Sequence, residues 1–109
     1  MNNIKYVKIA GKTYPASLNM LALSNFLEQE NVSFEDFDKF ITQSLENLFK
    51  LFHFILVYGG SRQEKPFEKS IDELADMVGM NINLIHNTIA HFMPDNEKKP
   101  KTQRTKKKK

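Results

Sequence analysis

Apolar residues near the N-terminus follow a strand-like pattern, whereas those after residue 17 recur at helical spacing. Residues 4–9 (IKYVKI) are rich in β-branched and aromatic side chains, residues 10–12 (AGK) have turn composition, and 13–15 can return as a second strand. Pro15 has no N–H to donate, so it belongs at a sheet edge or at the end of a strand. The pattern predicts an N-terminal β-hairpin, which needs a helix to pack on because two strands alone are marginally stable.

Five segments with helical spacing follow, and most have a start or stop signal. We expect helices at 18–28, 34–42, 44–58, 71–78 and 82–92. Ser33, Ser70 and Asn81 stand at N-cap positions, and Ser70 opens the capping box S-I-D-E. The expected stops are Asn31, Gly59-Gly60, Gly79 and Pro94. The pattern loosens around residues 42–44, which leaves open whether the second and third helices are continuous.

These elements predict a mostly α (α+β) fold of four to five helices with a short N-terminal β-hairpin, in one domain spanning residues 1–93. Residues 94–109 (PDNEKKPKTQRTKKKK) hold eight Lys/Arg, two acids and no apolar residue. Such a composition cannot offset the entropy of ordering its backbone, so we expect a disordered basic tail. Residues 1–93 then hold eight basic and eleven acidic residues, so the net charge of +3 combines an acidic body with a basic tail.

The composition excludes several classes of protein. The chain has no Cys, which excludes disulfides, zinc–thiolate sites and thiol catalysis. The N-terminus lacks the apolar run of a signal peptide. The most apolar stretch, 45–58, is 14 residues long, whereas a membrane-spanning helix needs ~20. We therefore expect a soluble cytoplasmic protein without a membrane partner.

Catalysis and metal binding have little support in the sequence. His86 and His91 are five residues apart, which places them on different faces of a helix and not at the i, i+4 spacing of a metal site. His53 stands alone, and Gly59-Gly60 follows a helix, whereas a phosphate-binding loop follows a strand. The acids are scattered without motif spacing. We expect no enzymatic activity, no cofactor and no metal.

Residues 70–89 (SIDELADMVGMNINLIHNTI) have the spacing of a helix-turn-helix. Ala75 would pack between the helices, Gly79 would take the turn, and Ile85 would anchor the recognition helix. The side chains at base edges would be Asn81, Asn83, His86 and Asn87. Against this alternative, residues 70–97 contain no Lys or Arg, and phosphate contacts dominate DNA affinity. An ordinary pair of packed helices produces the same spacing.

The helix expected at 44–58 is apolar on two faces. One face carries Leu45, Leu48, Phe49, Phe52 and Leu56. The other carries Leu51, Phe54 and Tyr58. A helix of this kind is either the buried centre of its domain or keeps one face for a partner. In the second case, Leu51, Phe54 and Tyr58 are the candidate partner-binding residues.

Four segments occur in a characteristic order. They are a hairpin KIAGKTYP at 8–15, a capped start SFEDF at 33–37, an apolar helix LENLFKLFHFILVYGG at 45–60 and a serine-capped SIDELADMV at 70–78. This order, over residues ~4–93, resembles the small helical tail assembly chaperones of long-tailed (siphovirus-type) bacteriophages and prophages. The likeness lies in patterns of apolar and polar residues, so it carries over no catalytic residue.

The resemblance implies a non-enzymatic protein of the host bacterial cytoplasm that binds the tape measure protein. It would assist assembly of the tail tube protein, with self-association as an option, and would be absent from the mature particle. Many such chaperones are made in two lengths by ribosomal frameshifting, and A-rich codons for residues 106–109 would suit that arrangement. The alternative is a small helix-turn-helix DNA-binding regulator that uses residues 70–92 and the basic tail.

Overall fold

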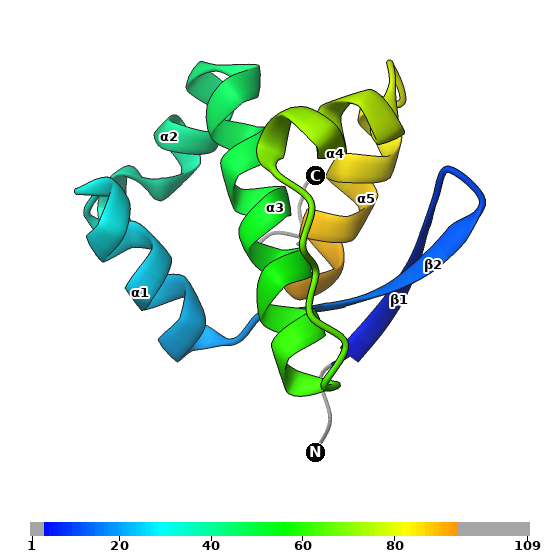
Figure 1. The fold of residues 1–109 in the computed structure, drawn as a ribbon. Coiled ribbons are helices and arrows are strands. Elements are labelled where there is room, and N and C mark those ends of the chain that lie inside the picture. The colour runs from blue at the N-terminus through cyan, green and yellow to red at the C-terminus, as the bar shows by residue number, and fades with distance from the viewer. Residues whose placement is uncertain (1–3, 94–109) are drawn as a thin grey trace, which may run out of the picture.

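The computed structural model describes residues 4–93, where a β-hairpin and four α-helices are arranged around a fifth, central helix (Figure 1). The elements are β1 Ile4–Ile9, β2 Lys12–Ser17, α1 Met20–Glu30, the 3₁₀ helix η1 Phe34–Asp36, α2 Phe37–Gln43, α3 Leu45–Arg62, α4 Ile71–Val78 and α5 Ile82–Phe92. The hairpin and α1 lie on opposite sides of α3. The predicted class, mostly helical with an N-terminal hairpin, is confirmed. The predicted tail, 94–109, lies outside the described residues.

Strands β1 and β2 form an antiparallel pair with a tight turn. The two turn residues, Ala10 and Gly11, have φ of 53° and 84°, as in the type I′ turns whose twist suits two-residue hairpins. The register pairs Tyr6 with Pro15. β2 is longer than predicted because it continues past Pro15 to Ser17, where its last residues are buried against α3.

Capping residues set the bounds of α1. The Asn19 side chain accepts a hydrogen bond from the Ala22 N–H at 2.8 Å. The helix therefore begins at Met20, two residues later than predicted from the apolar period that starts at Leu18. Asn31 takes a left-handed conformation at the C-terminus of α1, which confirms the predicted stop.

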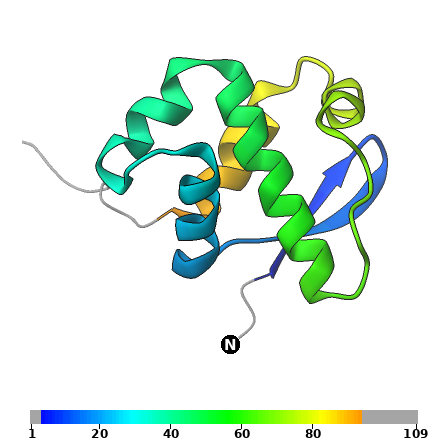
Figure 2. The same ribbon diagram turned by 60° about the vertical axis from the view of Figure 1, so that its left-hand side comes forward.

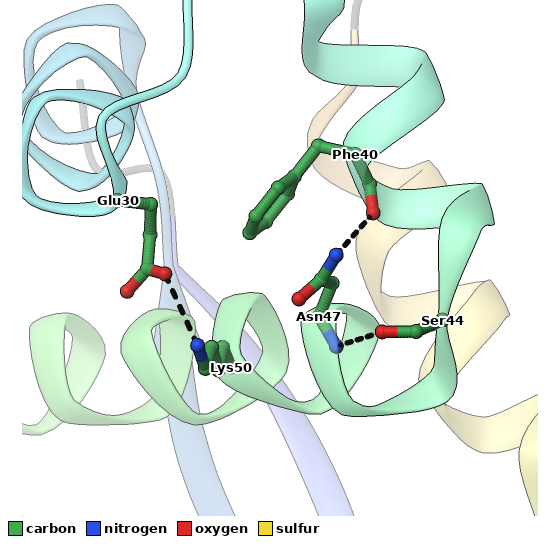
Figure 3. A network of polar contacts seen from close by, with 5 residues as sticks. All are labelled: Glu30, Phe40, Ser44, Asn47 and Lys50. Atoms are coloured by element: carbon green, nitrogen blue, oxygen red, sulfur yellow. Dashed lines mark hydrogen bonds and ion pairs between the residues drawn. The ribbon is translucent and has the colours of Figure 1, made fainter.

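Helices α2 and α3 are separate, which answers the question of continuity. The break is at Ser44, whose extended backbone (φ −154°, ψ 151°) interrupts the helical path. The Ser44 hydroxyl accepts a hydrogen bond from the Asn47 N–H at 3.1 Å, and the Asn47 side chain donates to the Phe40 carbonyl at 2.9 Å (Figure 3). Ser44 therefore starts α3, while Asn47 ties its first turn to α2.

The prediction that Gly59-Gly60 ends the central helix is wrong, because α3 continues to Arg62 with both glycines buried inside it. A Cβ on Gly59 would lie 2.5 Å from the Pro15 carbonyl oxygen, and a Cβ on Gly60 would lie 2.5 Å from the Lys65 carbonyl oxygen. The missing side chains let the α3 backbone approach β2 and the loop that follows α3. These glycines serve tertiary packing and do not stop the helix.

The last two helices match their predicted bounds. Ser70 opens α4 with a complete capping box, in which its hydroxyl accepts from the Glu73 N–H and the Glu73 carboxylate accepts from the Ser70 N–H. Gly79 (φ 64°) ends α4, and the Asn81 side chain caps α5. The Ser33 hydroxyl caps η1 by accepting a hydrogen bond from the Asp36 N–H. Each of these caps is a local interaction, which explains why the sequence predicted them.

Helix α3 forms the centre of the hydrophobic core. Figure 2 shows it crossing the molecule between α1 and α2 on one side and the hairpin on the other. Its fully buried residues are Leu51, Phe52, Ile55 and Leu56. Other elements contribute Val7, Ile9, Phe26, Leu74 and Ile85 to the same core. Within residues 4–93, no helix combines the length and apolar character needed to cross a membrane.

Candidate functional site

The three predicted partner-binding residues do not share one environment. Leu51 is fully buried, so its predicted place on an outward face is wrong. It stands three residues after Leu48 and four before Ile55, and it joins these two buried residues in one row of the helix. Phe54 and Tyr58 are partly buried at the margin of the core. Of the three, only Phe54 and Tyr58 offer surface to a partner in this fold.

A groove of about 380 Å³ lies between α1 and α3, beside Phe54. Its apolar lining residues are Phe26, Phe54, Val57 and Ile71. Its polar lining residues are Gln29, Glu30, Lys50 and His53. We call this surface the α1/α3 groove. Val57, which the sequence pattern did not single out, is 38% exposed. An apolar surface with a few polar groups beside it is typical of binding sites.

Polar contacts join α1 to α3 near both ends of α1. At its C-terminal end, the Lys50 ammonium donates to the Glu30 carboxylate at 3.3 Å (Figure 3). At its N-terminal end, the Asn19 side-chain amide donates to the Tyr58 hydroxyl at 2.9 Å. Helix α1 therefore runs alongside α3 in the opposite direction and is fixed at two points, with the α1/α3 groove next to it.

Aromatic rings fill the space between these two contacts. Phe26 of α1 faces Phe54 with ring centroids 5.2 Å apart, and Phe54 stacks on Tyr58 at 6.3 Å. Phe26 also meets Phe40 of α2 edge to face at 6.0 Å. The Arg62 guanidinium lies 5.5 Å from the centroid of the Tyr58 ring. Of these rings, Phe26 and Phe54 line the groove, and because aromatic rings carry large apolar areas with few rotatable bonds, they give it a firm apolar wall.

A second apolar surface lies on a different side of α1. Met20 and Leu21, in the first turn of the helix, are 61% and 79% exposed, and Phe34 of η1 is 59% exposed. A hollow of about 400 Å³ there has the apolar lining residues Met20, Leu23, Leu27, Val32 and Phe34. Helix α1 therefore presents apolar side chains on two sides, one toward the core and the α1/α3 groove and one outward.

The structure has the two helices and the turn that the helix-turn-helix alternative needs, with α4 and α5 joined by a turn at Gly79. Gly79 lies in the turn, Ile85 is fully buried and Ala75 is partly buried. The candidate base-reading residues are all exposed: Asn81, Asn83, His86 and Asn87. The Asn81 side chain, however, is engaged as the cap of α5. With no Lys or Arg in residues 70–97, this surface lacks the cations that phosphate groups require.

The histidines lie apart from one another. His53 places Nε2 2.8 Å from the Lys69 carbonyl oxygen and packs edge to face on Phe67, so it holds the loop after α3 onto the helix. His86 and His91 lie at exposed positions of α5. In the part of the chain that the structure describes, no group of three or more His, Cys, Asp or Glu is placed to hold a metal ion.

No protein-family model, curated protein or solved structure shows a significant match to this chain. Its own surfaces, above all the α1/α3 groove, are therefore the basis on which a function is assigned.

Proposed function

We propose that this protein is a non-enzymatic tail assembly chaperone that covers apolar helical segments of a phage tape measure protein while the tail tube protein assembles. The observation that carries the proposal is the α1/α3 groove, which leaves the partly exposed Phe54 ring and the Val57 side chain open beside two helices joined at two points. The order of the elements in the sequence supplies the resemblance to such chaperones, and the groove supplies a mode of binding.

An amphipathic helix is the ligand that this groove fits best. Helical ligands insert apolar side chains spaced three and four residues apart into an apolar groove. Phe54 and Val57 would meet those side chains, and Lys50, Glu30 and His53 would face the polar side of the ligand. A volume of about 380 Å³ is near the lower end for binding pockets. It would hold the apolar side chains of roughly one helical turn, which favours reversible binding.

Co-expression with a tape measure fragment from the same genome tests this proposal. Val57→Asp places a charge in the groove and should lower the amount of soluble fragment severalfold, because the charge would lose its hydration under the ligand. Ile82→Asp is the matched control, since Ile82 is also β-branched, helical and 38% exposed but lies outside the groove. Circular dichroism should show both variants folded. An equal loss of soluble fragment with both variants, or no loss with Val57→Asp, would exclude the α1/α3 groove as the binding site.

The neighbouring genes provide an independent check. A chaperone of this kind predicts a tail tube gene upstream and a very long coiled-coil gene downstream. A slippery run of A nucleotides at codons 106–109 would add a longer, frameshifted form. Neighbours unrelated to phage assembly would argue against the tape measure protein as the partner, whatever the groove binds.

A DNA-binding regulator is the second candidate, and one observation favours it. Asn83, His86 and Asn87 are exposed on α5, which follows α4 after a turn at Gly79. Binding to random duplex DNA, with and without residues 94–109, separates the two functions. Site-preferring binding by the shortened chain would replace the chaperone proposal. Salt-sensitive binding that needs residues 94–109 would indicate only charge attraction.

A further inference from the structure

The hairpin offers a second surface, separate from the α1/α3 groove. β1 pairs with β2 on one edge, and among residues 4–93 no further strand pairs with its other edge. An unpaired strand edge presents N–H and C=O groups that a further strand can bind. The question is which of these groups point outward.

The turn fixes the hydrogen-bonding pattern of the hairpin. In a two-residue hairpin the pair that flanks the turn, here Ile9 and Lys12, exchanges both backbone hydrogen bonds, and successive pairs then alternate. The residues of β1 whose N–H and C=O groups point away from β2 are therefore Ile4, Tyr6 and Lys8. Tyr6 pairs with Pro15, a non-bonded position where the missing N–H of proline costs nothing, so the register agrees with this pattern.

The two edges of the hairpin differ in access. On the β2 side, Gly59 of α3 lies so close that a Cβ there would be 2.5 Å from the Pro15 carbonyl oxygen and 2.6 Å from the Ala16 Cα. Helix α3 therefore covers the end of β2, where Pro15, Ala16 and Ser17 are buried. On β1, the Tyr6 side chain is 54% exposed and the Lys8 side chain is exposed. The edge of β1 is therefore the candidate for a ligand.

Positive charge surrounds the edge of β1. The hairpin carries Lys5, Lys8 and Lys12 and no acid. The Tyr6 hydroxyl donates to the Gln63 side-chain oxygen at 3.2 Å, which brings the end of α3 beside β1. Lys65 follows Gln63 by two residues, with Glu64 as the one acid between them, whereas the Arg62 guanidinium is engaged with Tyr58. Basic residues thus outnumber acids at this end of the molecule, although the described body as a whole is acidic.

We propose that β1 binds an extended, acidic segment of a partner protein by strand addition. The outward N–H and C=O groups of Tyr6 and Lys8 would pair with the ligand backbone, and Lys8 would attract its carboxylates. The protein's own residues 94–109 are strongly basic and would be repelled. A second copy bound through the same edge would bring two sets of lysines together, which also disfavours it. This inference does not rest on the proposed function, because it uses a different surface.

A labelled eight-residue peptide of alternating Glu and Thr is the probe, since Thr favours strands and Glu supplies the charge. Fluorescence anisotropy should show saturable binding to the full-length protein. Hydrogen exchange followed by NMR should show the Tyr6 and Lys8 amides becoming protected in the complex, while the Val7 and Ile9 amides are protected already. Lys8→Glu should weaken binding roughly tenfold, because it replaces cross-strand attraction by repulsion.

Lys39→Glu, at an exposed lysine of α2, is the matched control and should leave the affinity unchanged. The same peptide with methylated backbone amides keeps its carboxylates but loses its N–H donors, and it should not bind. Equal binding of the methylated peptide, unchanged exchange at Tyr6 and Lys8, or equal effects of the two variants would overturn strand addition. No saturable binding, or displacement of the peptide by a single-stranded oligonucleotide at lower concentration, would overturn the acidic protein segment as the ligand.

Discussion

The two sides of α3 differ in how closely they approach the neighbouring elements. Toward the hairpin, Gly59 brings the helix backbone against the backbone of Pro15 and Ala16. Toward α1, the rings of Phe54 and Tyr58 keep the helices apart and leave the α1/α3 groove beside them. The size of the side chains on each side of one helix therefore decides which side is closed and which can receive a ligand.

Among substitutions that test this difference, we expect Gly59→Ala to have one of the largest effects on the free energy of unfolding. In an ordinary helix Ala is ~1 kcal/mol more favourable than Gly, but here its Cβ would lie 2.5 to 2.7 Å from the hairpin backbone. The hairpin would have to move, at a cost of about 3 kcal/mol in the free energy of unfolding. Urea denaturation measures this cost. Ser61→Ala, at the exposed position two residues on, should stay within about 0.5 kcal/mol. A stabilised Gly59→Ala would show that the two backbones are not in close contact.

Alanine substitutions of Phe52 and Phe54 compare the closed and open sides of α3 directly. Phe52→Ala removes a fully buried ring and should cost about 3 to 5 kcal/mol. Phe54→Ala removes a partly exposed ring and should cost about 2 kcal/mol, because less apolar area returns to water. Chemical denaturation of the two variants under the same conditions measures the difference. Equal costs would mean that the α1 side is as closed as the core.

Substitutions of Asn19 and Tyr58 test the contact that joins the N-terminal end of α1 to α3. Asn19→Ala removes both the cap of α1 and the hydrogen bond to Tyr58, so it should cost about 1 to 2 kcal/mol. Tyr58→Phe keeps the ring and the cap and removes only the hydroxyl, so it should cost about 0.5 kcal/mol. Thermal unfolding of both variants gives the comparison. A Tyr58→Phe variant that is no more stable than Asn19→Ala would show that the cap contributes nothing.

Removal of the Lys50–Glu30 ion pair should have the smallest effect on the free energy of unfolding. The side chains of the pair are partly buried, at 34% and 24% exposure, and ion pairs that water still reaches contribute little. Lys50→Met, which keeps most of the apolar stem, should change the free energy of unfolding by about 0.5 kcal/mol or less. The difference from the parent protein should shrink further in high salt. A larger, salt-insensitive effect would mean that α1 is held in place chiefly by this contact.

Features encoded by neighbouring residues were predictable from the sequence. The caps at Ser33, Ser70 and Asn81, the stops at Asn31 and Gly79, and the hairpin turn all depend on local hydrogen bonds or backbone conformations. These signals were enough to predict the fold class and the bounds of α4 and α5. The helical period also placed Phe54 and Tyr58 away from the face of Leu48, Phe52 and Leu56, and both lie at the margin of the core.

Features that depend on distant segments were not predictable. Glycine ends helices and also allows close approach, and only the position of β2 shows which role Gly59 has. Leu51 lies at the edge of the row that it shares with Phe54 and Tyr58, next to the buried Leu48 and Ile55, so a helical wheel could not tell that it is buried. The exposure of Val57 depends on where α1 stops covering α3, which no pattern within either helix determines.

The most direct test of the central claim is to ask whether a ligand covers Val57. The chain has no Cys, so a single Val57→Cys variant can carry an environment-sensitive fluorophore, with Ile82→Cys as the control of equal native exposure. The tape measure fragment should shield the label at residue 57 from iodide quenching and leave the label at residue 82 accessible. Equal accessibility at both positions in a complex shown to be saturated, or shielding at residue 82 alone, would contradict binding in the α1/α3 groove.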